Sequence, residues 1–201
     1  MADLPSLFHD GTWREIRLDM ATSVKPDIVA SMTDMREVPD DFADALLSSH
    51  NIEHVYWHEV PKALGEFKRV IKPGGFVCIY CPDIQLIGEK VTEGDLLATI
   101  YDSPSGPITP MDFLYGLRPS LASGAHSMAH KCAFAQPMLF DLLKQAGFAR
   151  FTVRRLYRVR ELLAVAIKAP VGQFTAKAVL DRLVETDRRP IQTPPDEVQA
   201  E

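Results

Sequence analysis

The alternation of apolar and polar positions along the first eighty residues predicts a parallel α/β sheet. Residues 15–20 alternate polar and apolar side chains with the period of a strand, and residues 26–31 form a second short strand. A third strand is predicted over residues 43–49, and the almost uniformly apolar run 76–81 is typical of a central strand covered on both faces. Strands that alternate with helices indicate a doubly wound, mostly parallel sheet.

Apolar stripes and helix-ending residues predict the helices. One stripe has its members three or four residues apart, as on one face of a helix: Val60, Leu64, Phe67 and Ile71. The run Lys72-Pro73-Gly74-Gly75 is expected to end this helix, because proline cannot continue it and glycine permits a positive φ. A second helix is predicted from Gln136 to Ala146, with Gly147 as its stop.

The rest of the chain suggests one domain with an insertion and a separate C-terminal tail. Residues 84–133 break the strand-helix rhythm, contain a turn-rich loop and a short helix near 111–116, and are expected to form a lid over the active face. Residues 151–159 and 162–168 predict two adjacent antiparallel strands that complete a domain over residues 1–170. Within 171–201 we expect a last amphipathic helix and then, from Arg188, a disordered tail.

Composition narrows the class of protein and its location. The net charge of −5 argues against a nucleic-acid partner, because general nucleic-acid binders are usually basic. Three cysteines without a framework spacing fit a reducing compartment. Cys78 and Cys81 form a C-x-x-C inside an apolar strand, so buried thiols are the favoured interpretation over a redox pair. No apolar run spans a membrane and no secretion signal is visible, so we expect a cytoplasmic protein without a membrane partner.

Acidic residues follow the ends of the first two predicted strands. Ligands of open parallel sheets bind at the carboxyl ends of the strands, and a carboxylate there can accept both hydroxyls of a ribose. Asp19 is placed for that contact, and Asp34, after the next strand, for an adenine amino group. Met35 is a candidate to cover the adenine face, although ordinary core packing explains it equally well.

These motifs in sequence resemble the methyltransferase type 11 group of the class I S-adenosylmethionine-dependent methyltransferases. The resemblance is carried by residues 13–19, 25–29, 31–35, 48–54 and 67–76; it is close over 13–83 and extends by element order to about 168. It implies a Rossmann-like, seven-stranded sheet with an antiparallel last strand, S-adenosylmethionine as cofactor and a small-molecule acceptor. It also implies the cofactor-binding residues, which are Asp19 at the ribose, Asp34 and Met35 at the adenine, Ser48 and Ser49 at the amino-acid end, and in addition Met20.

The first strand of that group and its Gly-x-Gly loop have no counterpart here. Gly11, Gly74 and Gly75 lie elsewhere in the sequence, so we expect an N-terminally incomplete sheet in which an empty position separates the strands that end at Asp19 and Ser49. A chain that is a fragment, a site completed by another chain, and a non-catalytic module that binds or dimerises through its exposed sheet all remain open. A homodimer is therefore one expected assembly.

The histidines offer two further interpretations. His50-Asn51-Ile52-Glu53-His54 matches the H-x-x-E-H signature of a zinc hydrolase, a distant alternative because the first histidine directly follows a strand. In a methyltransferase, no metal is expected, and His50 or His54 is a candidate general base; for His54 a structural hydrogen bond to a loop carbonyl is as good an explanation. In the insertion, Tyr115, His126 and His130 are candidate substrate contacts, against the simpler alternative of a polar loop.

Overall fold

The computed structural model describes residues 5–103, 105–169, 175–186 and 198–200, and a five-stranded sheet forms its centre. In spatial order its strands are β3 (Ala43–Ser49), β4 (Ile71–Pro82), β8 (Glu161–Ile167), β7 (Arg150–Leu156) and β9 (Val198–Ala200). β3 and β4 pair in parallel, whereas β8 lies between β4 and β7 and runs antiparallel to both. β3, β4 and β7 therefore share one direction, and the antiparallel final strand of the predicted domain, β8, is confirmed.

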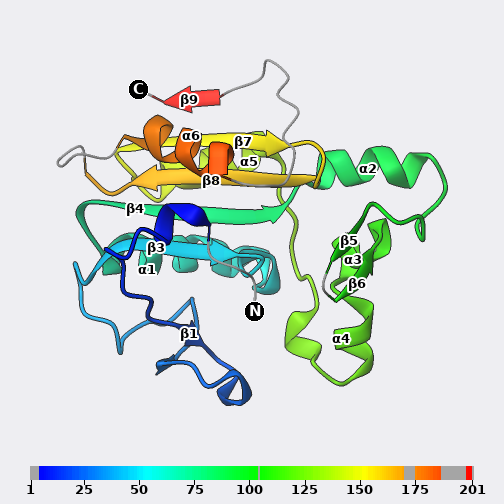
Figure 1. Cartoon of the computed structure of the whole chain (residues 1–201), viewed down its shortest axis with the longest axis horizontal. Coiled ribbons are helices and arrows are strands. Elements are labelled where there is room, and N and C mark those ends of the chain that lie inside the picture. Colours follow the sequence, from blue (N-terminus) through cyan, green and yellow to red (C-terminus); the bar gives the residue numbers. More distant parts are fainter. Residues whose placement is uncertain (1–4, 104, 170–174, 187–197, 201) are drawn as a thin grey trace.

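Helices cover both faces of this sheet and make a three-layer domain (Figure 1). One face carries α1 (Val60–Val70) and α5 (Gln136–Gln145), and the other carries α6 (Ala176–Thr186) and the 3-10 turn η1 (Ser6–Phe8). Side chains of β4 alternate between the two cores, so Cys81 lies in the first and Cys78 in the second. Both thiols are buried, and burial raises the pKa of each. The C-x-x-C pair is thus a structural part of the strand, as the sequence favours.

The first two predicted strands are shorter than expected and stand apart from the main sheet. β1 (Leu18–Asp19) and β2 (Ile28–Val29) pair in parallel as a separate two-stranded sheet, and β3 is the outer strand of the larger sheet among the described strands. The seven-stranded sheet implied by the resemblance is therefore not what the described residues form. The separation of β1 from β3 agrees with the expected empty position between them. Hydrogen bonds of Arg17 hold the chain together just before the small sheet begins. Its carbonyl accepts from the Asp27 N–H, its N–H donates to the Asp27 carboxylate, and its guanidinium donates to the Lys25 carbonyl.

The end of α1 differs from the prediction by a few residues. The helix ends at Val70, and the Lys72-Pro73-Gly74-Gly75 segment belongs to the start of β4. Backbone N–H groups of Asp41 and Phe42 donate to the carbonyls of Arg69 and Val70 at 3.0 and 2.8 Å. These bonds satisfy carbonyl groups in the last turn of the helix, directly before β4 begins. Gly75 has a steric reason, since a Cβ there would lie 2.8 Å from the Asp44 carbonyl oxygen on β3.

Residues 84–133 leave the sheet after β4 and return before α5. They form α2 (Ile84–Thr92), the hairpin of β5 (Tyr101–Ser103) and β6 (Gly106–Ile108), then α3 (Pro110–Tyr115), α4 (Arg118–Ala122) and the 3-10 turn η5 (His126–Met128). Figure 1 shows this insertion beyond the carboxyl ends of β3 and β4. Its two ends meet, because Asp83 and Phe134 form a parallel bridge and the Ile84 N–H donates to the Phe134 carbonyl at 2.9 Å.

One buried carboxylate organises the middle of the insertion. Asp112 is 4% exposed and accepts hydrogen bonds from the backbone N–H and hydroxyl of Thr109 at 3.0 and 2.6 Å. Its other oxygen accepts from the backbone N–H and Nε of Arg118 at 3.0 and 2.9 Å. Burial alone would raise the pKa of this carboxyl, but these hydrogen bonds outweigh burial and lower it to about 2. Asp112 therefore joins the start of α3 to the start of α4.

The C-terminal region corrects one expectation. Of the tail predicted to be disordered, residues 188–197 and 201 lie outside the described residues, while Val198–Ala200 forms β9, antiparallel to β7. β9 pairs through its backbone with the edge of β7 that faces away from β8. Such pairing requires no apolar side chains, which explains why the sequence pattern does not predict this strand. None of the described helices has the length and apolar character that crossing a bilayer requires.

Candidate functional site

The carboxyl ends of β3 and β4 carry a cluster of histidine and acidic side chains. β3 ends at Ser49, which pairs with Tyr80 of β4, and the chain then turns through His50, whose φ is 52°. The His50 N–H donates to the Tyr80 carbonyl at 2.9 Å, so the turn is fixed to the sheet. The 3-10 turn η3 (Ile52–His54) follows at once and aims its acidic and basic side chains toward the insertion.

His50 bridges two buried carboxylates. Its Nδ1 lies 3.4 Å from Glu53 Oε1, and its Nε2 lies 3.3 Å from Glu161 Oε1 at the start of β8. Burial alone would lower the pKa of this imidazole, but the two carboxylates outweigh burial and raise it to about 10. His50 is then an imidazolium near pH 7 and has no lone pair to accept a proton. The geometry therefore favours an electrostatic role for His50 over the expected general base.

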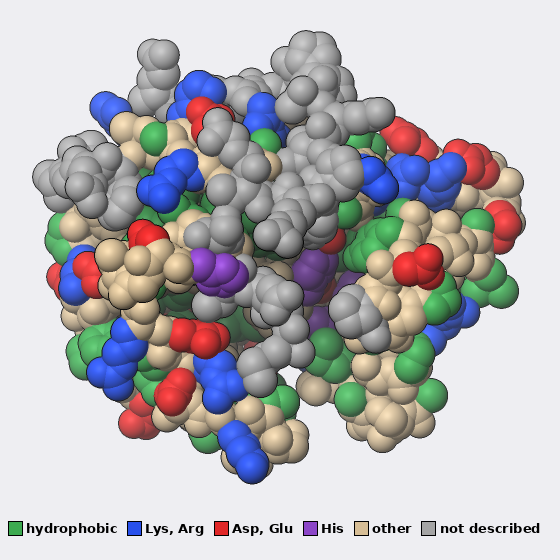
Figure 2. Space-filling view, viewed as in Figure 1, with side chains coloured by type: hydrophobic (Ala, Val, Ile, Leu, Met, Phe, Trp, Pro, Cys, Tyr) green, Lys and Arg blue, Asp and Glu red, His purple; other side chains and the backbone are tan. Residues whose placement is uncertain are grey.

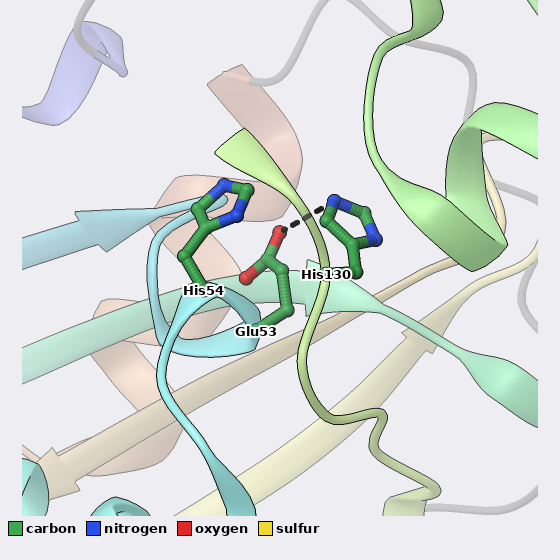
Figure 3. A group of neighbouring side chains, drawn as sticks. All are labelled: Glu53, His54 and His130. Carbon is green, nitrogen blue, oxygen red and sulfur yellow. Dashed lines mark ion pairs between the residues drawn. The ribbon is translucent and has the colours of Figure 1, made fainter. Parts of the chain in front are cut away.

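Glu53, His54 and His130 converge at the same place from two parts of the chain. Their ligand atoms all lie within 4.8 Å of one another, and His130 Nε2 is 4.0 Å from Glu53 Oε1. Figure 3 shows the Glu53 side chain pointing between the two imidazoles, whose ring centres are 5.1 Å apart. Glu53 is 1% exposed, whereas both histidines are half-buried. In Figure 2, histidine side chains line the recess between the sheet and the insertion.

Backbone carbonyls orient both histidine rings. His54 Nδ1 lies 3.2 Å from the Ala129 carbonyl oxygen, and His130 Nδ1 lies 2.7 Å from that of Phe113. A carbonyl can only accept, so each Nδ1 carries the hydrogen and each Nε2 keeps its lone pair. Burial also lowers the pKa of His130, which keeps it neutral. The structural hydrogen bond considered for His54 is thus present, and it leaves the other ring nitrogen available.

The returning end of the insertion is held on η3 by its backbone. The N–H groups of Lys131 and Cys132 both donate to the Glu53 carbonyl, at 2.8 and 3.3 Å. The Cys132 thiol lies 3.5 Å from the Ile52 carbonyl oxygen, and burial raises its pKa to about 12. These contacts set the position of His130 relative to Glu53.

A third carboxylate, Asp83, stands at the end of β4 where the insertion begins. It is fully buried, accepts a hydrogen bond from the Gln85 N–H at 3.0 Å as the N-cap of α2, and lies 3.0 Å from Nε of Arg155 on β7. Burial raises the pKa of this carboxyl, and Arg155 partly offsets the effect. Asp83 therefore links the root of the insertion to the sheet.

The residues expected at the nucleoside lie on the smaller sheet. Asp19 ends β1 and accepts a hydrogen bond from the Ala21 N–H at 2.7 Å, and Met20 beside it is exposed. Asp34 follows β2 and is held by Arg36, whose guanidinium lowers the pKa of the Asp34 carboxyl. Met35 packs in the core with α1, and its N–H donates to Glu66 at 2.6 Å. Of these residues, Asp19, Met20 and Asp34 are accessible to a ligand.

The remaining predicted contacts divide into two groups. Ser48 is buried in β3 without a hydrogen-bond partner for its hydroxyl among the described residues, and Ser49 is half-buried at the strand end. In the insertion, Tyr115 is exposed, but its carbonyl accepts from the His130 N–H at 3.2 Å. His126 is exposed on η5, away from the buried end of the returning segment. Of the three insertion residues, the structure brings only His130 into the group at η3.

Three acids of this site are not among the site residues that the sequence predicts. Glu53 appears there only within the zinc-hydrolase alternative, and Asp83 and Glu161 are not predicted. Glu161 begins β8 and Asp83 follows β4, and the antiparallel pairing of Pro82 with Glu161 brings them to one edge. Each of these two acids adjoins a strongly apolar run in the sequence, and this is the signal that could have identified them. An acid in such a position is expected to be buried, and a buried carboxylate needs a partner.

We expect the substitution Gly116→Ala to disturb this site from a distance. Gly116 has a φ of 100°, and a Cβ there would lie 2.2 Å from the Met128 carbonyl oxygen, in the segment that leads to His130. The substitution forces that segment away from α3 and costs about 1–3 kcal/mol of unfolding free energy. Urea denaturation measures the loss, with Gly88→Ala on α2 as control, because no atom lies within 4 Å of a Cβ there. Equal stability of the two variants would contradict the expectation.

Comparisons with known proteins agree with this architecture. The model of the methyltransferase domain family matches residues 14–79, which include β1, β2, β3, His50, His54 and most of β4. No curated protein sequence gives a match. The match ends inside β4, so the insertion and the last strands lie outside it.

Solved structures with the same fold are distant in sequence. A protein from Pyrococcus horikoshii is 15% identical with a TM-score of 0.53, over 80% of this chain and 74% of that one. A SAM-dependent methyltransferase from Archaeoglobus fulgidus is 12% identical with a TM-score of 0.50, over 75% and 74%. An O-methyltransferase family protein from Burkholderia thailandensis is 14% identical with a TM-score of 0.43, over 71% of this chain, which spans only 35% of that protein.

Identities this low establish a shared fold and nothing about substrates. The family match covers residues 14–79, which contain Asp19 at the end of β1, Asp34 after β2 and the two serines at the end of β3. The chain therefore matches the methyltransferase domain family over residues 14–79, and its fold is that of the solved structures above.

Proposed function

We propose that this protein is an enzyme that transfers a methyl group from S-adenosylmethionine to a small-molecule acceptor. The observation that carries the proposal is the position of the family match, which covers Asp19, Asp34, Ser48 and Ser49. In parallel sheets, ligands bind beyond the carboxyl ends of the strands, and Asp19 and Ser49 are the last residues of β1 and β3. Asp19 would accept the ribose hydroxyls, with Met20 beside it.

Asp34 would receive the adenine amino group. Its present partner Arg36 is mostly exposed, and exposed ion pairs contribute little to stability, so a ligand can displace Arg36 at small cost. Met35, buried beneath this turn, would support the adenine site from the core. Ser48 and Ser49 would line the amino-acid end of the cofactor.

The acceptor would bind in the recess between the sheet and the insertion, beside His50, His54 and His130. Methyl transfer is an in-line displacement to which positioning contributes most. His50 would act through its charge. The rings of His54 and His130 would face the acceptor, and Tyr115 and His126 would line the outer part of the recess.

Titration calorimetry with S-adenosylmethionine and S-adenosylhomocysteine tests the cofactor site. We expect binding at micromolar strength by the full chain. The substitution Asp19→Ala should weaken it about 10- to 100-fold, because hydrogen bonds to a charged group contribute about 1.5–3 kcal/mol. Asp44→Ala is the matched control: it removes an exposed aspartate at the opposite end of β3 and should leave affinity unchanged within twofold.

A different outcome would favour the second candidate, a non-catalytic module that dimerises. The observation behind it is β3, whose outer edge is not paired with any other described strand, and unpaired edges are templates for pairing with a second chain. Failure of the full chain to bind either ligand at millimolar concentration, together with a dimeric mass by light scattering, would replace the enzyme by this module.

A further inference from the structure

We propose that Glu53, His54 and His130 form a binding site for a divalent transition metal ion, with Zn²⁺ as the fitting ion. The three ligand atoms lie within 4.8 Å of one another, close enough for small adjustments to place them around one ion. Two imidazoles and one carboxylate are a common ligand set of zinc sites with an open position. The inference goes beyond methyl transfer and does not depend on it.

The orientation of both rings is the first argument. In metal sites the ligating histidine donates its other ring N–H to a carbonyl or carboxylate, which fixes the tautomer. Here the Nδ1 atoms of His54 and His130 are 3.2 and 2.7 Å from backbone carbonyl oxygens, so both Nε2 atoms keep a lone pair, and that of His130 lies 4.0 Å from Glu53 Oε1. Two histidines that are 76 residues apart in the sequence thus have the same tautomer, fixed by the same kind of hydrogen bond.

The environment of Glu53 is the second, independent argument. The side chain is 1% exposed and points between the two rings, and neither carboxylate oxygen has a hydrogen-bond partner among the described residues. Its nearest cationic neighbour, His50, is shared with Glu161 and stays 3.4 Å away. A buried carboxylate without hydrogen bonds is costly, and a cation between Glu53 and the histidines would remove that cost.

The ligand types narrow the ion. Calcium and magnesium prefer sites made of oxygen atoms, whereas imidazole nitrogen suits zinc and its neighbours in the first transition row. Three protein ligands leave one tetrahedral position open, which is the arrangement of a reactive rather than a purely structural site. The half-exposed histidines give an ion access from the recess.

This site is not the one that the H-x-x-E-H pattern suggests. His50, the first histidine of that pattern, has both ring nitrogens facing carboxylates and is not a ligand. Its place is taken by His130, which the insertion brings back to η3 through the Lys131 and Cys132 backbone. The sheet and the insertion therefore build the site together.

Calorimetric titration of the metal-free full chain with zinc chloride, without cofactor, tests the proposal. We expect one ion per chain with a micromolar or lower dissociation constant. The substitutions His54→Gln and His130→Gln should each weaken binding by at least about tenfold, since even residues that support ligands change affinity about 10–100-fold. His58→Gln is the control, because His58 is an exposed histidine four residues beyond His54 and faces Tyr56.

A thermal measurement keeps the test valid if one variant folds poorly. Zinc at 100 times its dissociation constant should raise the melting temperature of the unaltered chain by about 5–10 °C, and that of either folded glutamine variant by much less. Absence of zinc binding up to millimolar concentration would overturn the proposal. So would binding that both glutamine variants retain, or that His58→Gln weakens equally. None of these results depends on whether the chain binds S-adenosylmethionine.

Discussion

Replacing Asp83 by alanine is expected to lower the free energy of unfolding by about 3–5 kcal/mol, the cost of breaking a buried ion pair on one side. Asp83 is fully buried, and its carboxylate lies 3.0 Å from Nε of Arg155, which is itself largely buried. The alanine leaves that guanidinium without its carboxylate and also removes the N-cap of α2, which contributes about 1 kcal/mol by itself.

Asp83→Asn separates the two contributions. The amide oxygen can still accept from the Gln85 N–H, so the cap is kept while the charge is lost. We expect this variant to fall between the unaltered chain and the alanine variant in urea denaturation. Loss of less than about 1 kcal/mol in the alanine variant would contradict the assignment of Asp83 as an anchor.

The substitution Asp112→Asn is expected to destabilise the insertion by about 2 kcal/mol at neutral pH. This figure follows from a carboxyl whose pKa is lowered from 3.8 to about 2, because each unit of pKa corresponds to about 1.4 kcal/mol. A lowered folded pKa means that the contribution is fully present above pH 3.8 and is lost as the pH falls through about 2. The difference between the unaltered chain and the variant should therefore shrink over that range.

Hydrogen exchange is the suitable measurement, because the insertion can open without unfolding the sheet. We expect faster exchange at the N–H groups of Thr109, Arg118 and their neighbours, and unchanged protection in β4 and β8. Asp102→Asn, at an exposed position on β5, is the control. Equal protection in both variants at neutral pH would show that Asp112 does not hold the insertion.

Periodicity along the sequence predicts most of the central domain. β3 has the predicted bounds of residues 43–49, and α1, α5, β7 and β8 lie within a few residues of their predictions. These elements are readable because one face of each packs into a core, so packing and pattern coincide. Where backbone pairing alone decides, as for β9 and for the first residues of β4, the pattern carries no signal.

The candidate site is predictable only in its local parts. Acids after strands and the His50 to His54 run are visible in the sequence, and the structure places them at strand ends. The contact between Glu53 and His130 depends on where a 50-residue excursion returns, which no local pattern encodes. The pairing of His50 with Glu161 likewise requires the antiparallel register of β8 against β4.

The bridge between Asp83 and Phe134 has an evolutionary consequence. Because the excursion begins and ends at neighbouring points, residues 84–133 can be lengthened, shortened or exchanged without rerouting any strand. Such an exchange would replace the wall of the recess proposed for the acceptor and, with His130, one of the three proposed metal ligands. The proposed acceptor site and the proposed metal site would then be inherited together, as one exchangeable module on an otherwise constant sheet.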